Sequence, residues 1–383
     1  MELRKGYKQT ETGVIPEDWS VKPISFALSI KHGKDQKAVK SEDGIYPILG
    51  TGGIMGHSTT PIYSKESVLI GRKGTIDKPV YMDIPFWTVD TLFYSEVNED
   101  YNAKFLYYKF LLIDWYAHNE ASGVPSLNAR TIEKIEISLP PTKAEQTAIA
   151  TALSDMDNLI DGLEKLIAKK KAIKQGAMQE LLRPKEGWVE KRLGDSADIS
   201  RGGSPRPIER YLTNAPDGIN WIKIGDVEKF AKYIENTEEK IIPEGISRSR
   251  FVNEGDFLLS NSMSFGRPYI LKTNGCIHDG WLVIQNYKEH FNRDFLYYVL
   301  GSESVLVQYR AMASGSSVLN LNKEIVKNVL INCTESLEEQ AEIATVLSDM
   351  DNEIMLLESN LEKHKLLKQG MMQELLTGRI RLI

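Results

Sequence analysis

The chain has 383 residues, of which 42% are apolar and 26% charged, and its formal net charge is −6 at pH 7. This length allows two or three domains with cores of their own. There is no apolar run near the ~18 residues of a membrane-spanning helix, and two cysteines are too few for a disulfide framework. Because the charge is mixed and slightly acidic, any DNA-binding surface must be a local basic patch. With no signal peptide at the N-terminus, we expect a cytoplasmic protein.

The first part of the chain, residues 1–141, has the pattern of a β-rich globular domain. Short runs of strand-forming residues at 67–70 and 86–89 are separated by glycine and proline turns. A helix is expected near 102–118, and an apolar alternation over 132–139 leads into the next segment. We therefore predict a domain of strands and short helices that ends where a long helix begins.

Residues 142–183 and 336–383 carry two copies of one long helical segment. From Glu145 and Glu339 onward the copies align without a gap, and about 24 of the 38 positions are identical, far above chance. Apolar residues recur in steps of three and four, which places them on one stripe and predicts the seam of a coiled coil. The predicted helix-pair interface comprises Ile149, Leu153, Met156, Ile160, Leu163, Ile167, Ile343, Leu347, Met350, Ile354, Leu357 and Leu361.

Both helical segments begin with the same capping signal. Thr142 with Glu145, and Ser336 with Glu339, fit the box in which a hydroxyl and a carboxylate satisfy backbone donors at a helix start. A helix of about 40 residues is about 60 Å long. One apolar stripe does not stabilise such a helix alone, so it needs a partner. The simplest partner for each helix is the other, lying antiparallel.

The apolar stripe is interrupted in the second half of each copy. Lys170 and His364 stand where an apolar residue is expected, and the pattern resumes out of phase at Ile173 and Leu367. We expect the supercoil to loosen there.

Residues 184–335 repeat the order of the first domain. The segment 292–298 resembles 102–108, and the loop 313–320 resembles 121–128. Between these landmarks the domains diverge, whereas the helices stay alike. The expected fold is α+β: a pseudo-twofold tandem duplication with two globular heads, separated by two long helices that form an antiparallel coiled coil. Because the two heads differ in sequence and the two helices are alike, we expect two different ligand sites that the helices hold in one geometry.

Three motifs suggest ligands but have simpler interpretations. The glycine-rich residues 50–59 fit neither the P-loop nor the dinucleotide fingerprint, so we expect a turn-rich surface loop. The Asp-Met-Asp-Asn repeats at 155–158 and 349–352 lack the glycine and glutamate of a calcium loop, which favours solvated acidic residues beside the seam. The Phe-Leu-Tyr-Tyr motifs at 105–108 and 295–298 could stack on bases, but their helical spacing favours core packing.

The sequence contains no recognisable catalytic set. It lacks an Asn-Pro-Pro-aromatic methyltransferase motif, a nucleophile elbow and a paired-histidine metal motif. Its six histidines are scattered without ligand spacing. We therefore expect neither a catalytic residue nor a bound metal in this chain.

The divergent loops of the two heads are the candidate DNA-binding sites. Their glycine, serine, asparagine and arginine residues can approach a phosphate backbone and read base edges. Ordinary polar turns remain an equally good interpretation. The candidates are Arg72, Lys73, Thr75, Ser122 and Ser126 in the first head, and Arg201, Ser204, Arg206, Asn261, Ser262, Ser264, Arg267, Ser316 and Ser317 in the second.

With two unlike heads and two like helices, the chain resembles the specificity (S) subunits of type I restriction-modification systems. The resemblance is carried by the Glu-Gln starts and Leu-Leu ends of the helices, the opening segment 7–19 and the tail 375–378. It covers nearly the whole chain. It implies that each head is a target-recognition domain for one half of an asymmetric, bipartite DNA target. It also implies that the helices set the spacer and dock methyltransferase subunits.

The resemblance further implies the partners and cofactors. Two methyltransferase (M) subunits and restriction (R) subunits would assemble with this chain on double-stranded DNA, with no membrane involved. S-adenosylmethionine would bind to the methyltransferase, and no cofactor would bind to this chain, which would have no catalytic role. Heads on one face of DNA would lie about one helical turn, or 34 Å, apart.

Two alternatives remain open. A coiled-coil interaction scaffold would bind protein partners without DNA, and salt-dependent, sequence-specific DNA binding distinguishes the two functions. A specificity subunit without a restriction partner of its own would also bind DNA, and the sequence does not separate it from a complete system.

Overall fold

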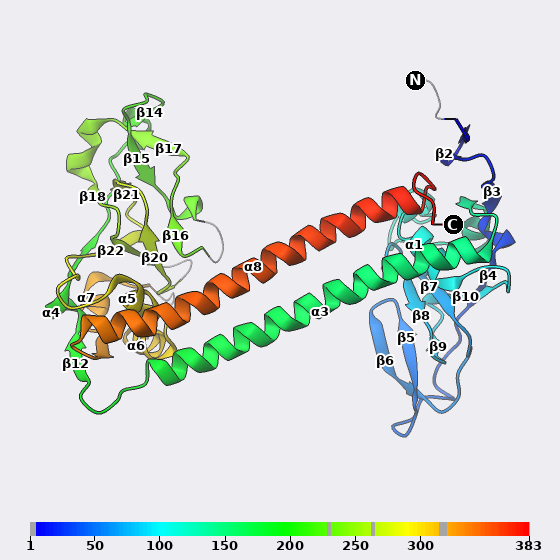
Figure 1. The fold of residues 1–383 in the computed structure, drawn as a ribbon, viewed down its shortest axis with the longest axis horizontal. Helices are drawn as coiled ribbons and strands as arrows, with labels where there is room; N and C mark the ends of the chain where they lie inside the picture. Colours follow the sequence, from blue (N-terminus) through cyan, green and yellow to red (C-terminus); the bar gives the residue numbers. More distant parts are fainter. Residues whose placement is uncertain (1–4, 228–230, 262–264, 314–319, 383) are drawn as a thin grey trace. The chain divides into compact units, whose positions relative to one another are not determined.

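The computed structural model of the protein describes residues 5–227, 231–261, 265–313 and 320–382. The chain divides into two compact units (Figure 1), which are Met1–Lys165 with Ser359–Ile383 and Leu166–Glu358. Each unit holds one head and a part of both long helices.

The first head contains short strands and helices. Its strands are β1 (Tyr7–Thr10), β2 (Gly13–Pro16), β3 (Ser20–Pro23), β4 (Leu28–His32), β5 (Tyr46–Gly50), β6 (Gly53–Ser58), β7 (Ser67–Gly71), β8 (Val80–Met82), β9 (Trp87–Thr88), β10 (Leu92–Val97) and β11 (Glu136–Leu139). Its helical elements are η1 (Ile24–Phe26), α1 (Ala103–Phe110), η2 (Trp115–His118) and α2 (Ala129–Lys134). The expected helix near 102–118 is therefore a shorter α-helix followed by a 3₁₀ turn.

The second head is built in the same way. Its strands are β12 (Val189–Arg192), β13 (Asp198–Arg201), β14 (Leu212–Thr213), β15 (Ile219–Ile222), β16 (Tyr233–Ile234), β17 (Glu239–Ile241), β18 (Arg250–Val252), β19 (Phe257–Ser260), β20 (Pro268–Leu271), β21 (Gly275–Ile277), β22 (Trp281–Gln285) and β23 (Leu330–Cys333). Its helical elements are α4 (Leu193–Ser196), η3 (Ile208–Arg210), η4 (Ile224–Asp226), η5 (Pro243–Arg248), α5 (Arg293–Leu300), α6 (Glu303–Ala313) and α7 (Lys323–Lys327).

The sheets of the two heads share one topology. The first head has a sheet of order β4-β10-β7-β8, and the second has β13-β22-β19-β20-β16. A smaller sheet, β6-β5-β9, corresponds to the centre of β14-β17-β15-β21-β18, because β5 with β9 and β15 with β21 are both parallel pairs. The smaller sheet lies away from α1 in the first head, and β14, β15 and β17 lie away from α5 in the second (Figure 1). This common topology confirms the tandem duplication.

The glycine-rich segment 50–59 lies at the surface and contains a turn, as expected, but it forms a β-hairpin instead of a loop. Strands β5 and β6 pair antiparallel across a turn at Thr51 and Gly52. Gly56 has a φ of 145°, and a register shift at Ile48 and Leu49 allows the strand to bulge.

The two long helices are α3 (Lys143–Leu181) and α8 (Leu337–Leu375), each of 39 residues. Their capping hydroxyls act as expected: Thr142 accepts a hydrogen bond from the backbone N–H of Glu145, and Ser336 accepts one from Glu339, both at 3.2 Å. The two glutamates bind other side chains. Glu145 is held by Arg381, and Glu339 accepts from the indole of Trp188 at 3.4 Å.

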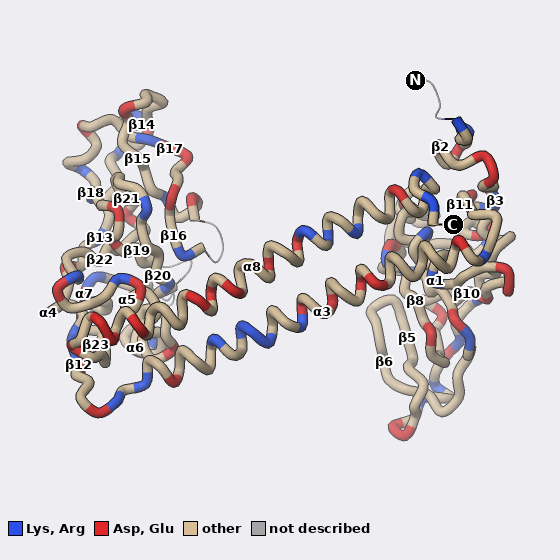
Figure 2. Tube along the Cα trace, viewed as in Figure 1, with Lys and Arg blue, Asp and Glu red and all other residues tan. Residues whose placement is uncertain are grey.

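Ion pairs place α3 and α8 antiparallel (Figure 2). In the first unit, Lys365 pairs with Glu164 at 2.9 Å and Lys368 pairs with Asp157. The second unit contains the equivalent pairs, which are Lys171 with Glu358 at 2.6 Å and Lys174 with Asp351. In both units the residue numbers on one helix rise as those on the other fall.

The twelve predicted interface residues are all buried or half-buried. However, Ile149 and Leu153 pack into the core of the first head, and Ile343 and Leu347 into that of the second. The predicted continuation of the stripe is wrong, because Ile173 and Leu367 are 47% and 49% exposed. Charged residues occupy the facing surface there, with an additional ion pair of Lys170 and Glu353 at 2.6 Å.

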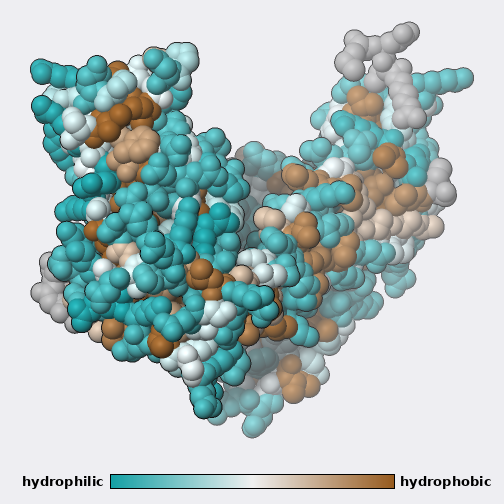
Figure 3. Space-filling model, turned by 60° about the vertical axis from the view of Figure 1, so that its left-hand side comes forward, coloured by the Kyte–Doolittle hydropathy of each residue, from teal (hydrophilic) through white to brown (hydrophobic). Residues whose placement is uncertain are grey.

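Some apolar residues of the long helices remain uncovered. Leu356 in the second unit and Leu366 in the first are each 68% exposed. The space-filling view shows apolar patches between hydrophilic areas (Figure 3). A large contiguous apolar patch marks a surface that binds another molecule, whereas a single exposed leucine does not.

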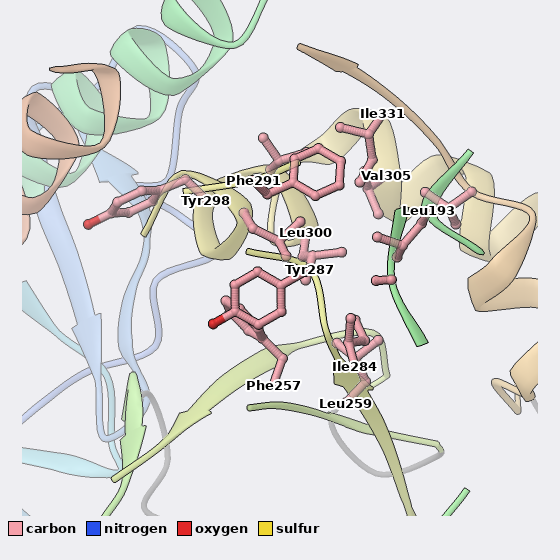
Figure 4. Close-up of a cluster of buried hydrophobic side chains, with 14 of the residues drawn as sticks. Leu193, Phe257, Leu259, Ile284, Tyr287, Phe291, Tyr298, Leu300, Val305 and Ile331 are labelled. Atoms are coloured by element: carbon pink, nitrogen blue, oxygen red, sulfur yellow. The ribbon is translucent and has the colours of Figure 1, made fainter. Parts of the chain in front are cut away.

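Each head has a hydrophobic core shared with the helices. In the second unit, Phe257, Tyr287 and Leu300 pack together with other buried side chains, and the hydroxyl of Tyr298 points away from this cluster (Figure 4). The Phe-Leu-Tyr-Tyr motifs supply core residues in both heads, as predicted: the side chains of Phe105, Leu106 and Tyr108 and of their counterparts in α5 are buried.

Candidate nucleic-acid interface

The candidate loops of the first head meet where strands of its two sheets end. The backbone N–H of Arg72, just after β7, donates to the carbonyl of Thr91 before β10 at 2.8 Å. The carbonyl of Arg72 accepts from Leu127 at 2.9 Å, and Lys34 after β4 donates to Thr88 at 2.9 Å. We call residues 32–34, 72–75, 88–91 and 119–127 the first loop cluster.

The second head repeats this frame. Asn261 donates through its backbone to Gly280 at 3.1 Å and accepts from Leu321 at 2.8 Å, and Gly203 donates to Ile277 at 3.1 Å. We call residues 201–206, 260–261, 277–280 and 320–321 the second loop cluster. These three hydrogen bonds are the counterparts of the three described in the first cluster.

A close backbone approach requires glycine at one position in each cluster. A Cβ on Gly33 would lie 2.0 Å from the carbonyl oxygen of Val89, and one on Gly202 would lie 2.2 Å from that of His278. Both contacts are far below a van der Waals separation, so no other residue fits without moving the backbone. The two loops at each site are thus held in a fixed relation.

The side chains on this common frame differ between the heads. Arg72 Nη1 donates to the carbonyl of Asp90 at 3.2 Å, and the amide of Asn261 makes the corresponding contact to Asp279 at 3.5 Å. An arginine in one head thus stands where the other has an asparagine. These groups offer different donors and acceptors to a ligand.

Arg72, Lys73 and Ser126 of the first head are brought together. Lys73 and Ser126 form an isolated antiparallel bridge, and Ser126 donates its N–H to the side chain of Asn119 at 2.9 Å. Ser122 lies exposed in the same loop. Thr75 follows at the end of the turn after β7.

Asp279 joins the candidates of the second head. Its Oδ1 accepts from Ser204 Oγ at 3.1 Å, its Oδ2 lies 3.4 Å from Arg206 Nη2, and its carbonyl accepts from Arg201 Nε at 2.9 Å. The imidazole Nε2 of His278 lies 3.0 Å from Oδ1. Four of the predicted residues, Arg201, Ser204, Arg206 and Asn261, therefore surround one turn.

The electrostatics of this turn favour an ionised Asp279. Burial opposes ionisation, but His278, the hydroxyl of Ser204 and two arginines outweigh it and lower the pKa of the carboxyl below its usual value. A cavity of about 520 Å³ adjoins the turn, and Ser204, Arg206, Trp221, Lys223, Glu239 and His278 are among its lining residues.

Not every predicted residue belongs to these clusters. Arg267 donates to the carbonyl of Ala231 at 3.4 Å and stacks over Tyr269. The predicted residues Ser262, Ser264, Ser316 and Ser317 lie outside the described part of the chain.

Several residues of the two loop clusters were not predicted from the sequence. His32, Lys34 and Asp90 belong to the first, and His278 and Asp279 to the second. A comparison of the residues just before β10 and β22 would have identified Asp90 and Asp279, because both heads place an aspartate there.

The heads are also fixed to the long helices by polar contacts. The side chain of Gln146 accepts from the backbone of Asn102 at 2.9 Å, and Gln340 accepts from Asn292 at 2.8 Å. Both glutamines are buried. Of the acidic residues expected to be solvated, Asp155 and Asp349 are exposed. The expectation is wrong for Asp157 and Asp351, which are half-buried and accept hydrogen bonds from head tyrosines.

Within the described ranges, no three His, Cys, Asp or Glu side chains gather as a metal-binding group. Over the same ranges, no helix is long and apolar enough to cross a membrane.

Comparison with known proteins identifies the family. A family model described as the type I restriction modification DNA specificity domain matches residues 16–175 and again 185–364. Two relatives from Methanocaldococcus jannaschii are each 24% identical to the chain. They are the type I restriction enzyme MjaVIII specificity subunit, over 98% of this chain and 96% of that one, and the putative MjaX specificity subunit, over 98% and 97%.

Solved structures share the fold. The S subunit of a type I restriction-modification system from M. genitalium aligns with a TM-score of 0.63 and 16% identity over 98% of both chains. A chain from a study of complex assembly and conformational transition in a type I system aligns with a TM-score of 0.60 and 16% identity, over 96% of this chain and 99% of that one.

The fold and the repeated domain define an α+β protein with two target-recognition domains and long helices that pack together. Because the family model matches most of the chain, the protein belongs to the type I restriction-modification DNA specificity subunits. It is thus the non-catalytic, DNA-specificity component of such a system. This membership decides against the scaffold that binds no DNA.

Proposed function

We propose that each head reads one half of an asymmetric, bipartite DNA target. The observation that carries this proposal is the common hydrogen-bonded frame of the two loop clusters, which presents different side chains. A shared frame would offer both clusters to DNA in equivalent ways, and unlike side chains would select unlike base sequences.

The DNA-contacting residues would be the candidates in the two clusters. In the first head these are Arg72, Lys73, Thr75, Ser122 and Ser126. In the second head they are Arg201, Ser204, Arg206 and Asn261. Their loops lie at strand ends and carry donors that base edges and phosphates accept. All of these residues are exposed or half-buried except Asn261, which is 7% exposed.

The long helices would set the spacer of the target and dock two methyltransferase subunits. The apolar residues that stay exposed on α3 and α8, among them Leu159, Leu356 and Leu366, are available to such subunits. Restriction subunits would complete the assembly, and S-adenosylmethionine would be bound by the methyltransferase. In such an assembly this chain would recognise the DNA target and set the spacing between its two halves.

The test is to isolate this chain from its native host, count the subunits and map adenine methylation with and without its gene. We expect about two methyltransferase copies per chain and one bipartite methylated motif that disappears on deletion. Unrelated partners, or a methylation pattern unchanged by the deletion, would contradict the proposal.

A further inference from the structure

Arg206 has an unusual position in the second loop cluster. It extends from the loop that follows β13, and its side chain is 79% exposed. The guanidinium has five N–H donors, and its described contact to Asp279 engages one of them, at Nη2. Among the described residues, no other contact engages the remaining donors, so they are available to a ligand.

Asp279 fixes the orientation of this arginine. Its Oδ1 is engaged by Ser204 and His278, at 3.1 and 3.0 Å, which leaves Oδ2 for Arg206. The backbone N–H of Asp279 donates in turn to Ser204 Oγ at 3.3 Å. Ser204 and His278 thus hold the carboxylate at Oδ1, and Ser204 also binds the backbone of the same residue. The single contact between Arg206 and Asp279, 3.4 Å from Nη2 to Oδ2, favours orientations in which the planar fork presents its other N–H groups away from Asp279.

The chemistry of the pair favours a base over a phosphate. A neighbouring carboxylate offsets the positive charge of Arg206, which weakens its attraction to the DNA backbone. The N–H groups of the Arg206 guanidinium can still donate directional hydrogen bonds. Two parallel N–H groups match the O6 and N7 acceptors of guanine in the major groove. The adjoining cavity of about 520 Å³, with Trp221 and Lys223 in its lining, leaves space beside the guanidinium for a base edge.

The first head lacks this arrangement. Its equivalent aspartate, Asp90, is contacted through its backbone carbonyl by Arg72, at 3.2 Å. Among the described residues, no cation pairs with the Asp90 carboxylate. An arginine oriented by an aspartate carboxylate would therefore contact only the half-site bound by the second head.

We propose that Arg206, oriented by Asp279, reads a guanine in the half-site bound by the second head; this inference rests on the proposed function. Arg206 is the specificity-determining residue, and Asp279 is a positioning residue that acts through it.

The experiment uses the complex of this chain with its methyltransferase subunits and duplex DNA libraries randomised over each half-site in turn. Arg206→Lys keeps the charge and removes the fork. We expect roughly 10- to 100-fold weaker discrimination at one guanine of the second half-site. Asp279→Asn should relax the same position to a smaller degree, with the slope of affinity against salt unchanged. The first half-site should be unaffected in both.

Arg210→Ala is the matched control, because this exposed arginine lies in the same loop region and outside the Asp279 turn. It should leave every base preference intact. A melting temperature for each variant complex separates altered reading from misfolding.

Three outcomes overturn the inference. One is a second half-site without a required guanine. Another is a uniform loss of affinity with a shallower salt slope in Arg206→Ala, while Arg206→Lys keeps both the base preference and the salt slope of the wild type; this pattern identifies a phosphate contact. The third is a relaxed position in the first half-site. If the wild-type complex selects no bipartite target at all, the proposed function itself fails, which is a distinct result.

Discussion

The hydroxyl of Tyr298 in the second head donates a hydrogen bond to Asp351 of α8, with 2.7 Å between the oxygens. Tyr108 makes the same contact to Asp157 of α3 in the first unit, at 2.6 Å. Each aspartate also pairs with a lysine of the antiparallel helix. The repeated Asp-Met-Asp motif therefore ties a head to both helices within each unit.

Removing one of these hydroxyls should loosen the head from its helix. Burial, together with the hydrogen bond to Asp351, raises the pKa of Tyr298, so the hydroxyl remains a donor at neutral pH. Tyr298→Phe should lower the free energy of unfolding of the second unit by roughly 1.5–3 kcal/mol, since the acceptor is charged. Urea denaturation measures the loss, and hydrogen exchange in α5 and α8 localises it.

Tyr211→Phe is the control for this change, because Tyr211 is half-buried in the same unit and its hydroxyl makes no hydrogen bond to a described residue. It should alter stability by less than about 0.5 kcal/mol. Equal losses in both variants would show that the contact with Asp351 contributes nothing specific.

Arg381 ties the C-terminal tail to the first head. Its guanidinium binds Asp18 at 2.9 Å and Glu145 at 2.8 Å, and the Glu145 side chain is 1% exposed. Arg381→Ala leaves this carboxylate buried without its cation, so we expect roughly 3–5 kcal/mol lower stability of the first unit. Adding Glu145→Gln should recover part of the loss, because a neutral amide is cheaper to bury.

The matched control is Arg379→Ala, which removes an arginine two residues away. Arg379 pairs with Glu374 at the surface, where an ion pair contributes about 0–1 kcal/mol. If Glu145→Gln worsens the Arg381→Ala variant, the buried carboxylate is not the cause of the instability.

Lys109 should make the stability of the first unit depend on pH. Its buried Nζ donates to Ser138 Oγ at 2.8 Å and to the carbonyl of Leu376, just after α8, at 3.0 Å. Burial lowers the pKa of Lys109 to about 7. In the unfolded chain a lysine titrates near about 10.4. Between these values the unfolded state binds the extra proton, so stability rises with pH across this window.

The test compares wild type with Lys109→Met by urea denaturation at pH 7 and pH 9.5. The wild type should gain up to about 1.4 kcal/mol per pH unit relative to the variant. Lys134→Met, at an exposed lysine nearby, should retain the wild-type slope. Identical slopes in wild type and Lys109→Met would mean that the buried amine does not titrate in this range.

The helices and the duplication were predictable because their signals are local or repeated. Spacing of three and four places Ile160 and Leu163 on one helical face, and self-comparison reveals the second copy. The roles of Asp157 and Asp351 were not predictable, because their tyrosine partners lie 49 and 53 residues away in sequence. Local spacing shows only that an acidic residue stands beside the seam.

Residue types predicted part of the candidate site, and the strand order of the sheet brings the remaining residue, Asp279, into it. Glycine, serine and arginine indicated the loops, and Arg201, Ser204 and Arg206 do meet there. Asp279 joins them from 75 residues away, because β13 and β22 are neighbours in the sheet. Without the strand order, nothing in the sequence connects that aspartate with Ser204.

Lengthening both long helices should lengthen the spacer of the DNA target. Four residues inserted after Ile167 and four after Leu361 keep the equivalent ion pairs of each unit in register. The added length is about 6 Å, or about 2 base pairs at roughly 3.4 Å each. Methylation mapping reads the new spacer. An insertion in α3 alone would shift the pairing and serves as the mismatched control.

A folded, active double insertion with an unchanged spacer would contradict the role of the helices as a ruler. It would leave the assignment of half-sites to the heads untouched, because that assignment depends on the loop clusters.

The most direct test of the central claim replaces the second head alone. Residues 185–335 are exchanged for the corresponding segment of a relative with a different target, and adenine methylation is mapped in cells that supply the methyltransferase. The account predicts that one half-site changes to that of the donor, while the other half-site and the spacer length stay as before. A change in both halves, or in neither, would contradict the claim that each head reads its own half of the target.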